Sequence, residues 1–220
     1  MAASPPVVPR RRRSAKARAE FRSALVREAG RLLREGGAAA VTIRSVTEAL
    51  GVSQMAFYTY FESKAALLRA CWRDSLLELQ RALVAAAAPG DEPSAVLHAH
   101  AMTFLRYWET QPDLYSLVYN PRQPARPSGE TVRAEAVYLE MQALAQRRIA
   151  AVLGSGVAFD DPLVVELTAH AFTKVVGYLH TVIELRRHEG AELDRLRERV
   201  VSDIVDAVRR CRAPRIEDRI

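Results

Sequence analysis

The sequence predicts an all-α fold, and three observations support this prediction. Apolar residues recur at intervals of three and four through most of the chain, the spacing that places them on one face of a helix. Glycines, prolines and capping residues separate these segments from one another. No segment alternates apolar and polar residues as a half-buried strand would. With 220 residues, the chain can bury a core that needs no disulfide or metal.

The first expected helix covers residues 17–35, where Leu25 and Leu32 are among the side chains of one apolar face. The glycine pair at 36–37 should end it, because glycine is favoured just past a helix C-terminus. Residues 1–15 contain three prolines and four consecutive arginines and have almost nothing to bury. We therefore expect a flexible basic arm before the first helix.

Two short helices follow around a glycine. Thr42 is an expected N-cap for a helix ending at residue 50, Gly51 breaks that helix, and Ser53 caps a second one over residues 54–60. These are the proportions of a helix-turn-helix, in which the first helix braces the second and glycine permits the tight turn. The second helix would then project side chains into a major groove about 12 Å wide.

The second short helix has a composition that is unusual for a helix buried in a core. Phe57 and Phe61 take the buried spacing, so Tyr58 and Tyr60 should point outward. Contact with phosphates and bases would explain two exposed tyrosines.

The rest of the chain also predicts helices. Ser63 should cap a long helix over residues 64–87, which a Pro-Gly turn at 89–93 follows. Residues 120–129, with three prolines and a glycine, are expected to form a loop. The further expected helices are residues 94–109, 113–119, 130–153, 162–188 and 193–208.

Two of these helices indicate a dimer. Residues 163–183 are apolar on nearly all sides and would have to be buried on every side, which an outer helix achieves only against a partner chain. The wide apolar stripe on 193–208 favours the same four-helix interface across a two-fold axis. The alternative is that both helices are ordinary core. The expected interface residues are Leu167, Val175, Leu179, Val182, Leu196, Val200, Ile204 and Val208.

The C-terminal helices also carry a cluster of aromatic and soft side chains. Small-molecule cavities are mostly apolar with a few polar tips, so this cluster indicates an apolar or aromatic ligand. Taken singly, a residue of this kind belongs to the core more often than to a ligand site. The candidate ligand-binding residues are Met102, Phe104, Trp108, Tyr115, Tyr119, Tyr138, Met141, Phe172, Tyr178 and His180.

Positive charge is concentrated at the N-terminus. Residues 1–64 carry a net charge of +7, whereas the remaining residues carry −1. Such a local excess is typical of phosphate binding. The alternative is a basic tail in front of a neutral domain, and whether residues 10–13 contact DNA stays open.

The sequence argues against several other classes of protein. Cys71 and Cys211 are far apart in no ligand-like spacing, and His98 and His100 would face away from each other on a helix. We find no phosphate loop or nucleophile elbow, and expect no enzyme, cofactor or metal. No apolar run could span a membrane or serve as a signal peptide, so we expect a cytoplasmic protein.

The helix-turn-helix segment resembles a known family. Residues 42–53 read TIRSVTEALGVS and residues 55–68 read MAFYTYFESKAALL, which is similar to the N-terminal domain of the TetR family of transcriptional repressors. The resemblance covers about residues 17–70, and the rest of the chain matches in helix count and order. Thr47 departs from the alanine usual in the family, and it fits a close helix crossing if its hydroxyl bonds back to its own helix.

The resemblance implies which residues meet DNA. Tyr58 and Lys64 are at positions that grip the DNA backbone, and Thr42 would meet a phosphate at the start of its helix. The remaining implied DNA-binding residues are Ser53 and, at positions that approach base edges, Arg44, Gln54, Met55, Ala56, Thr59 and Tyr60.

Side-chain chemistry suggests what the base contacts would be. Arg44 could pair with guanine and Gln54 with adenine, while Met55 and Ala56 could touch a thymine methyl. Alternatively, Met55 and Ala56 only pack, and Arg44 binds only phosphate.

The sequence thus predicts a homodimeric, ligand-responsive transcriptional regulator. It would bind a palindromic duplex operator as a repressor, and an apolar or aromatic effector would release it by shifting the helix at 64–87, so that effector and operator weaken each other's binding. The alternatives are a small-molecule binding protein with a non-functional DNA-binding domain and a helical enzyme acting on a hydrophobic substrate. The expected parts are a basic arm (1–15), a helix-turn-helix domain (16–62), a ligand-binding and dimerisation domain (63–212) and a tail (213–220).

Overall fold

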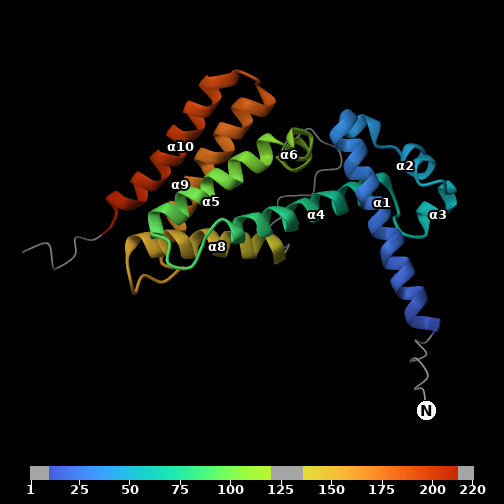
Figure 1. The fold of residues 1–220 in the computed structure, drawn as a ribbon, viewed down its shortest axis with the longest axis horizontal. Coiled ribbons are helices and arrows are strands. Elements are labelled where there is room, and N and C mark those ends of the chain that lie inside the picture. The colour runs from blue at the N-terminus through green and yellow to red at the C-terminus, as the bar shows by residue number, and fades with distance from the viewer. Residues whose placement is uncertain (1–9, 120–135, 213–220) are drawn as a thin grey trace, which may run out of the picture. The chain divides into compact units, whose positions relative to one another are not determined.

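The computed structural model describes residues 10–119 and 136–212, and in these ranges every regular element is a helix (Figure 1). The predicted all-α fold is confirmed. The chain divides into two compact units. We call residues 10–73 the N-terminal unit, and the described residues from 74 onward the C-terminal unit.

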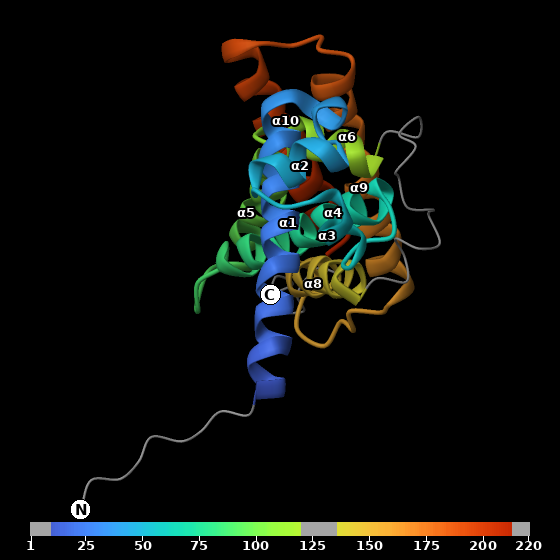
Figure 2. The same ribbon diagram turned by 90° about the vertical axis from the view of Figure 1, so that its right-hand side faces the viewer.

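The N-terminal unit holds α1 (Arg10–Ala40), α2 (Ile43–Ala49), α3 (Gln54–Tyr58) and the first part of α4 (Lys64–Ala85). Helix α2 contacts both α1 and α3 (Figure 2). Apolar side chains of these helices form the core of this unit. The buried apolar residues of the unit include Leu25, Ala29, Leu33, Val46, Phe57, Phe61, Leu67, Leu68 and Trp72.

Helix α1 differs from the prediction at both ends. It begins at Arg10, so residues 10–15 are helical rather than part of an arm, and residues 1–9 lie outside the described residues. Arginine and alanine are strong helix formers, so the helix extends back to the residue that follows Pro9. The break expected at the glycines is present, since Gly36 and Gly37 have non-helical backbone angles, and a short helical turn then continues to Ala40.

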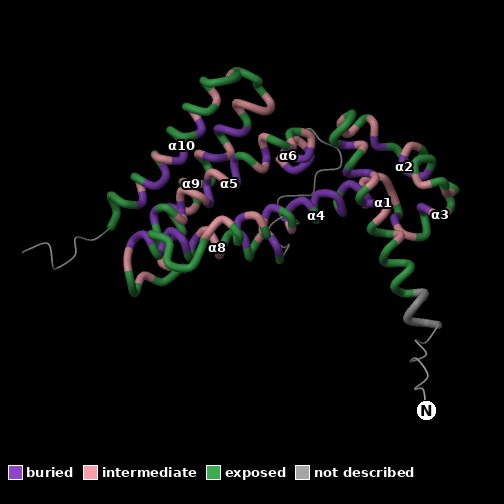
Figure 3. Tube along the Cα trace, viewed as in Figure 1, coloured by how far each residue is buried: buried purple, intermediate pink, exposed green. Residues whose placement is uncertain are grey.

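The C-terminal unit is a bundle in which α5 contacts α6, α8, α9 and α10. Buried positions recur along α4, α5 and α9 (Figure 3). The loop predicted at 120–129 and the first residues of the helix predicted at 130–153 lie outside the described residues. The helices of this unit that follow α4 are α5 (Pro93–Glu109), α6 (Pro112–Tyr119), α8 (Ala136–Leu153), α9 (Pro162–Leu179), a π-helical turn η1 (His180–Glu184) and α10 (Gly190–Arg210).

Helix α9 ends earlier than the periodicity predicts. At His180 the chain widens into η1, where the amide of Leu185 donates to the carbonyl of His180 over 3.1 Å. This is the i to i+5 spacing of a π-helix, a feature that apolar periodicity does not reveal. Arg186 then takes a positive φ of 47° and ends the helix.

Candidate DNA-binding surface and ligand cavity

Local hydrogen bonds fix the turn between α2 and α3. Thr42 Oγ1 accepts a bond from the Ser45 amide, and Ser45 Oγ accepts one from the Thr42 amide, each over 2.9 Å. This reciprocal pair satisfies two amides that a helix N-terminus leaves unpaired. Gly51 takes a φ of +66°, and Ser53 Oγ caps α3 by accepting from the Ala56 amide over 3.3 Å. The predicted capping residues and turn glycine are confirmed.

Thr47, the departure from the family pattern, is accommodated as expected. Its side chain is buried, and its Oγ1 donates to the carbonyl of Ile43 over 2.8 Å and lies 3.1 Å from that of Arg44. The hydroxyl is therefore satisfied within α2, which leaves the methyl group free to pack in the core.

Helix α3 exposes the side chains that a DNA-reading helix would need. Phe57 is buried in the core, whereas Met55 is 76% and Tyr58 is 52% exposed. Gln54 and Thr59 are also exposed. A large apolar side chain this far in solvent, beside an exposed tyrosine and an amide, is better suited to contact a partner than to stabilise the free domain.

Other predicted DNA-binding residues are partly engaged within the chain. Tyr60 is half-buried and packs on Phe21 with ring centroids 4.9 Å apart, so it points outward less than expected. Ala56 is also half-buried. Arg44 is exposed, and its Nε donates to Glu48 over 2.7 Å. Such an exposed ion pair contributes little and can be exchanged for a partner.

Lys64 has a role that the sequence did not reveal. Its Nζ donates to the carbonyl of Ala38 over 2.8 Å, at the end of α1, and its side chain is half-buried. An ammonium has three donors, so this bond leaves two for a phosphate. Lys64 therefore joins the start of α4 to the end of α1.

Replacing Thr42 by alanine should lower the free energy of unfolding by about 1 kcal/mol, because the α2 cap is lost. Urea unfolding followed by circular dichroism would measure this. Thr42→Ser, which keeps the hydroxyl, should stay within a few tenths of a kcal/mol of the parent. Equal losses for both variants would show that the threonine methyl, not the cap, stabilises α2.

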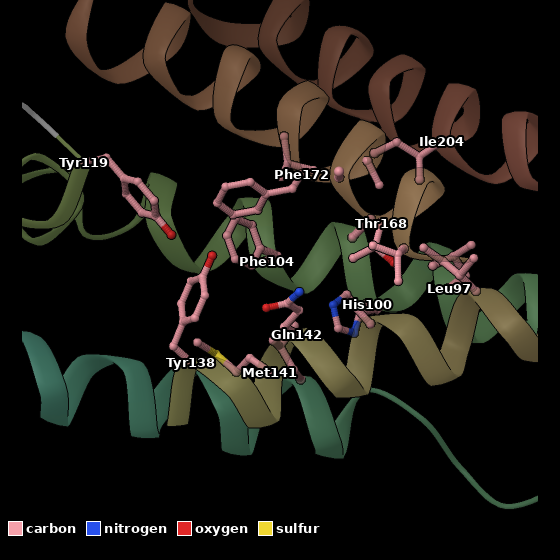
Figure 4. Close-up of a pocket in the computed structure, with 18 residues that line it drawn as sticks. Leu97, His100, Phe104, Tyr119, Tyr138, Met141, Gln142, Thr168, Phe172 and Ile204 are labelled. Atoms are coloured by element: carbon pink, nitrogen blue, oxygen red, sulfur yellow. The ribbon is translucent and has the colours of Figure 1, made fainter. Parts of the chain in front are cut away.

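The C-terminal unit contains a cavity of about 270 Å³ among α5, α8 and α9 (Figure 4). Most of its wall is apolar, with polar groups at a few points. This matches the usual composition of small-molecule sites and lies just below their usual range of size. The larger side chains that line it are Leu83, Leu97, His100, Phe104, Tyr119, Tyr138, Met141, Gln142, Ile149, Phe172, Val175 and Ile204.

Half of the predicted ligand-binding residues line this cavity. They are Phe104, Tyr119, Tyr138, Met141 and Phe172. Figure 4 shows the hydroxyls of Tyr119 and Tyr138 directed toward each other at one end. Burial, followed by the neighbouring tyrosines, raises the pKa of Tyr119, so its hydroxyl stays protonated and can donate a hydrogen bond.

The other five predicted residues do not line the cavity. Trp108 and Tyr115 are buried behind the wall, with ring centroids 5.7 Å and 4.8 Å from that of Tyr119. Tyr178 donates its hydroxyl to Glu109, Met102 is half-buried, and His180 is exposed in η1. Residue type alone could not separate the wall from the layer behind it.

His100 lines the cavity, a position that the sequence did not predict. The sequence had raised this residue only as a possible metal ligand together with His98, and the spacing of the two argued against that. His100 shares the buried face of α5 with Leu97 and Phe104, three and four residues away, and this spacing was a usable signal. His98 is directed elsewhere, with its Nε2 2.8 Å from Glu198. The expectation that the two histidines face apart is confirmed.

Arg148 holds His100 in place. Its guanidinium bonds to His100 Nδ1 over 2.6 Å and to the carbonyl of Leu83 over 2.7 Å, and both side chains are buried. Burial, with the charge of Arg148, lowers the pKa of His100 to about 3. His100 is therefore neutral at physiological pH.

The residues predicted at a dimer interface are divided between core and surface. Val182, Leu196 and Val200 are half-buried and remain accessible to a partner chain. On α9, Leu163 is also partly exposed, whereas the partly exposed Val165 and Phe172 line the cavity. The five buried within the single chain are Leu167, Val175, Leu179, Ile204 and Val208.

In the described ranges, no three His, Cys, Asp or Glu side chains are grouped so as to hold a metal ion. Nor does any helix of these ranges combine the length and apolar character needed to cross a bilayer. Cys71 is buried and Cys211 is exposed, and neither forms a disulfide.

Solved structures share this fold. A transcriptional regulator of the TetR/AcrR family from Thermobifida fusca YX-ER1 is 22% identical, with a TM-score of 0.63 over 85% of this chain and 97% of that one. A TetR variant from Acinetobacter baumannii AYE in complex with minocycline is 20% identical, with a TM-score of 0.61 over 86% and 97%. A TetR-family regulator from Bordetella parapertussis 12822 is 23% identical, with a TM-score of 0.55 over 84% and 94%.

The sequence match is confined to the N-terminal region. No curated protein matches the chain. The profile of the bacterial regulatory proteins of the tetR family matches residues 25–71, which include the capped α2, the Gly51 turn and α3. Residues 25–71 thus match the N-terminal domain of the bacterial regulatory proteins of the tetR family, which holds the helix-turn-helix, and the chain as a whole shares the fold of TetR-family regulators.

Proposed function

We propose that the protein is a ligand-responsive repressor that reads a palindromic operator through α3. The observation that carries the proposal is the exposure of Met55 and Tyr58 on a helix whose other face, at Phe57, is fixed in the core. We assign no catalytic activity to the chain, and as a DNA-binding regulator it would act in the cytoplasm.

The proposed DNA contacts follow from the surface of the N-terminal unit. Tyr58, Thr42 and the free donors of Lys64 would bind phosphates, and they would set the register without reading sequence. Gln54 would read adenine by a bidentate contact, and Arg44 would exchange Glu48 for a guanine or a phosphate. The remaining residues proposed to face the groove are Ser53, Met55, Ala56, Thr59 and Tyr60.

We propose that the cavity holds the effector. The TetR variant in complex with minocycline supports a small molecule as the ligand of this fold. Leu83 in the cavity wall and Lys64 at the other end belong to the same helix, α4. A ligand that repositions Leu83 would bias α4, and by linkage effector and operator would weaken each other's binding.

We propose a homodimer formed through α9, η1 and α10. Val182, Leu196 and Val200 are its candidate contacts, because they are apolar and remain partly exposed in the single chain. A two-fold pair of α3 helices would read two half-sites about one helical turn apart.

Selection of random duplex DNA by the full chain at near-physiological salt, followed by sequencing, tests the function directly. We expect a palindrome with half-sites about one helical turn, or roughly 34 Å, apart. An asymmetric motif would contradict the symmetric dimer. Recovery of no motif, with only weak and salt-sensitive binding, would favour a small-molecule binding protein with a non-functional DNA-binding domain.

Substitutions in α3 should separate two kinds of DNA contact. Tyr58→Phe removes only a hydroxyl, so it should weaken binding to all sequences about equally. Gln54→Ala should change base preference at one position per half-site, by about 1–3 kcal/mol. Fluorescence anisotropy with the selected operator and single-base variants would measure both. If Gln54→Ala leaves the preference unchanged, Gln54 does not contact a base.

A further inference from the structure

Arg148 is a buried cation without a carboxylate partner among the described residues. Its guanidinium contacts the imidazole of His100 and the carbonyl of Leu83, and burial lowers its pKa, an effect that no acidic side chain in the described part of the chain opposes. Buried charges are usually paired, because the loss of water is costly for an isolated ion. By contrast, Arg197, the other buried arginine of the unit, is paired with Glu109.

His100 connects this charge to the cavity. Its Nδ1 accepts a bond from Arg148, which has only donors, so the neutral ring carries its proton on Nε2. His100 lines the cavity, and Nε2–H is therefore the donor that the ring can offer a ligand. The side-chain amide of Gln142 lies next to His100 in the same space (Figure 4) and could donate a second bond.

The remainder of the cavity favours an apolar body. Phe104 and Phe172 lie 6.5 Å apart, centroid to centroid, at a steep angle of 72°, and Met141 forms the adjacent wall. Figure 4 places these side chains between the tyrosine end and the His100 end. A ligand whose acceptor reaches His100 would therefore place its other atoms against aromatic and thioether surfaces.

We infer that the effector is a small apolar carboxylate, bound with its carboxylate on His100 Nε2 beside the charge of Arg148. This inference rests on the proposed function only in calling the ligand an effector. A carboxylate is favoured over a neutral acceptor because the hydrogen bond would be charge-assisted and the buried cation would gain a counter-charge. Its apolar body would lie against the side chains of Phe104, Phe172 and Met141.

The experiment is calorimetric titration of the full chain, without DNA, with two pairs of matched probes. The first pair is 4-tert-butylbenzoate and 4-tert-butylbenzamide, and the second is octanoate and octanamide. We expect at least one carboxylate to bind about tenfold more tightly than its amide. Equal or tighter binding of both amides, or no binding of either carboxylate up to its solubility, would overturn the inference.

Variants identify the origin of the preference. Arg148→Gln keeps a hydrogen-bond donor at this position but removes the charge, and it should bring carboxylate and amide to within about twofold. Arg147→Gln makes the same change at an exposed position one residue away and should keep the preference. If Arg148→Gln keeps the preference as well, the inference is wrong. Should Arg148→Gln fail to fold, His100→Leu, which removes the donor, provides the same comparison.

These results are independent of operator binding. A chain that prefers carboxylates but selects no DNA motif would uphold the ligand class and contradict the regulator. A chain that selects a palindrome but prefers the amides would uphold the regulator and contradict the ligand class.

Discussion

Replacing Arg197 by alanine is expected to lower the free energy of unfolding of the C-terminal unit by about 3–5 kcal/mol. Arg197 Nε and Nη2 bind the carboxylate of Glu109 over 2.9 Å, with side chains only 10% and 12% exposed. Tyr178 donates to the same carboxylate. Removing the cation leaves a buried carboxylate without its counter-charge, at the junction of α5, α9 and α10.

Two further variants test whether the effect of Arg197→Ala comes from the burial of its ion pair with Glu109 and not from the loss of a charge as such. Asp194 also bonds to Arg197, but it is 73% exposed, so Asp194→Ala should cost about 1 kcal/mol or less. The double variant Arg197→Met with Glu109→Gln should recover part of the loss, because no charge is left buried. Urea unfolding at fixed protein concentration would measure all three. Equal effects of Arg197→Ala and Asp194→Ala would contradict the importance of burial.

Much of the fold was predictable because local rules and tertiary packing agree. Thr42, Gly51 and Ser53 were identified from capping and turn chemistry alone, and the structure uses each as predicted. The differences arise where the local signal is weak. Nothing in the periodicity of α9 distinguishes a helix that continues from one that widens to a π-turn at His180.

The candidate sites were predictable to different degrees. The exposed face of α3 follows from one short motif, so the sequence placed Gln54, Met55 and Tyr58 correctly at the surface. The cavity depends on contacts between residues far apart in the chain. Arg148 holds His100 across 48 positions, a pairing that no local pattern encodes. Periodicity likewise could not show that Ile204 faces its own core rather than a partner chain.

The contact between His100 and Arg148 predicts how the stability of the protein depends on pH. Burial and then the charge of Arg148 lower the pKa of His100 from 6.5 to about 3. Above pH 6.5 the histidine is neutral in both the folded and the unfolded chain, so its contribution to the free energy of unfolding is fully present. Below pH 6.5 the unfolded chain binds a proton that the folded chain does not, and stability falls until the pH approaches 3.

The parent protein should therefore lose about 2 kcal/mol more than His100→Leu when the pH is lowered from 7 to 5, since one proton changes the free energy by about 1.4 kcal/mol per pH unit. Urea unfolding at several pH values would give both slopes. His100→Leu also removes the acceptor of Arg148, but that loss is the same at each pH and cancels in the comparison. Carboxylates elsewhere in the chain titrate alike in both proteins. Parallel pH profiles would mean that His100 binds its proton in the folded state, which would require the imidazole to turn away from Arg148.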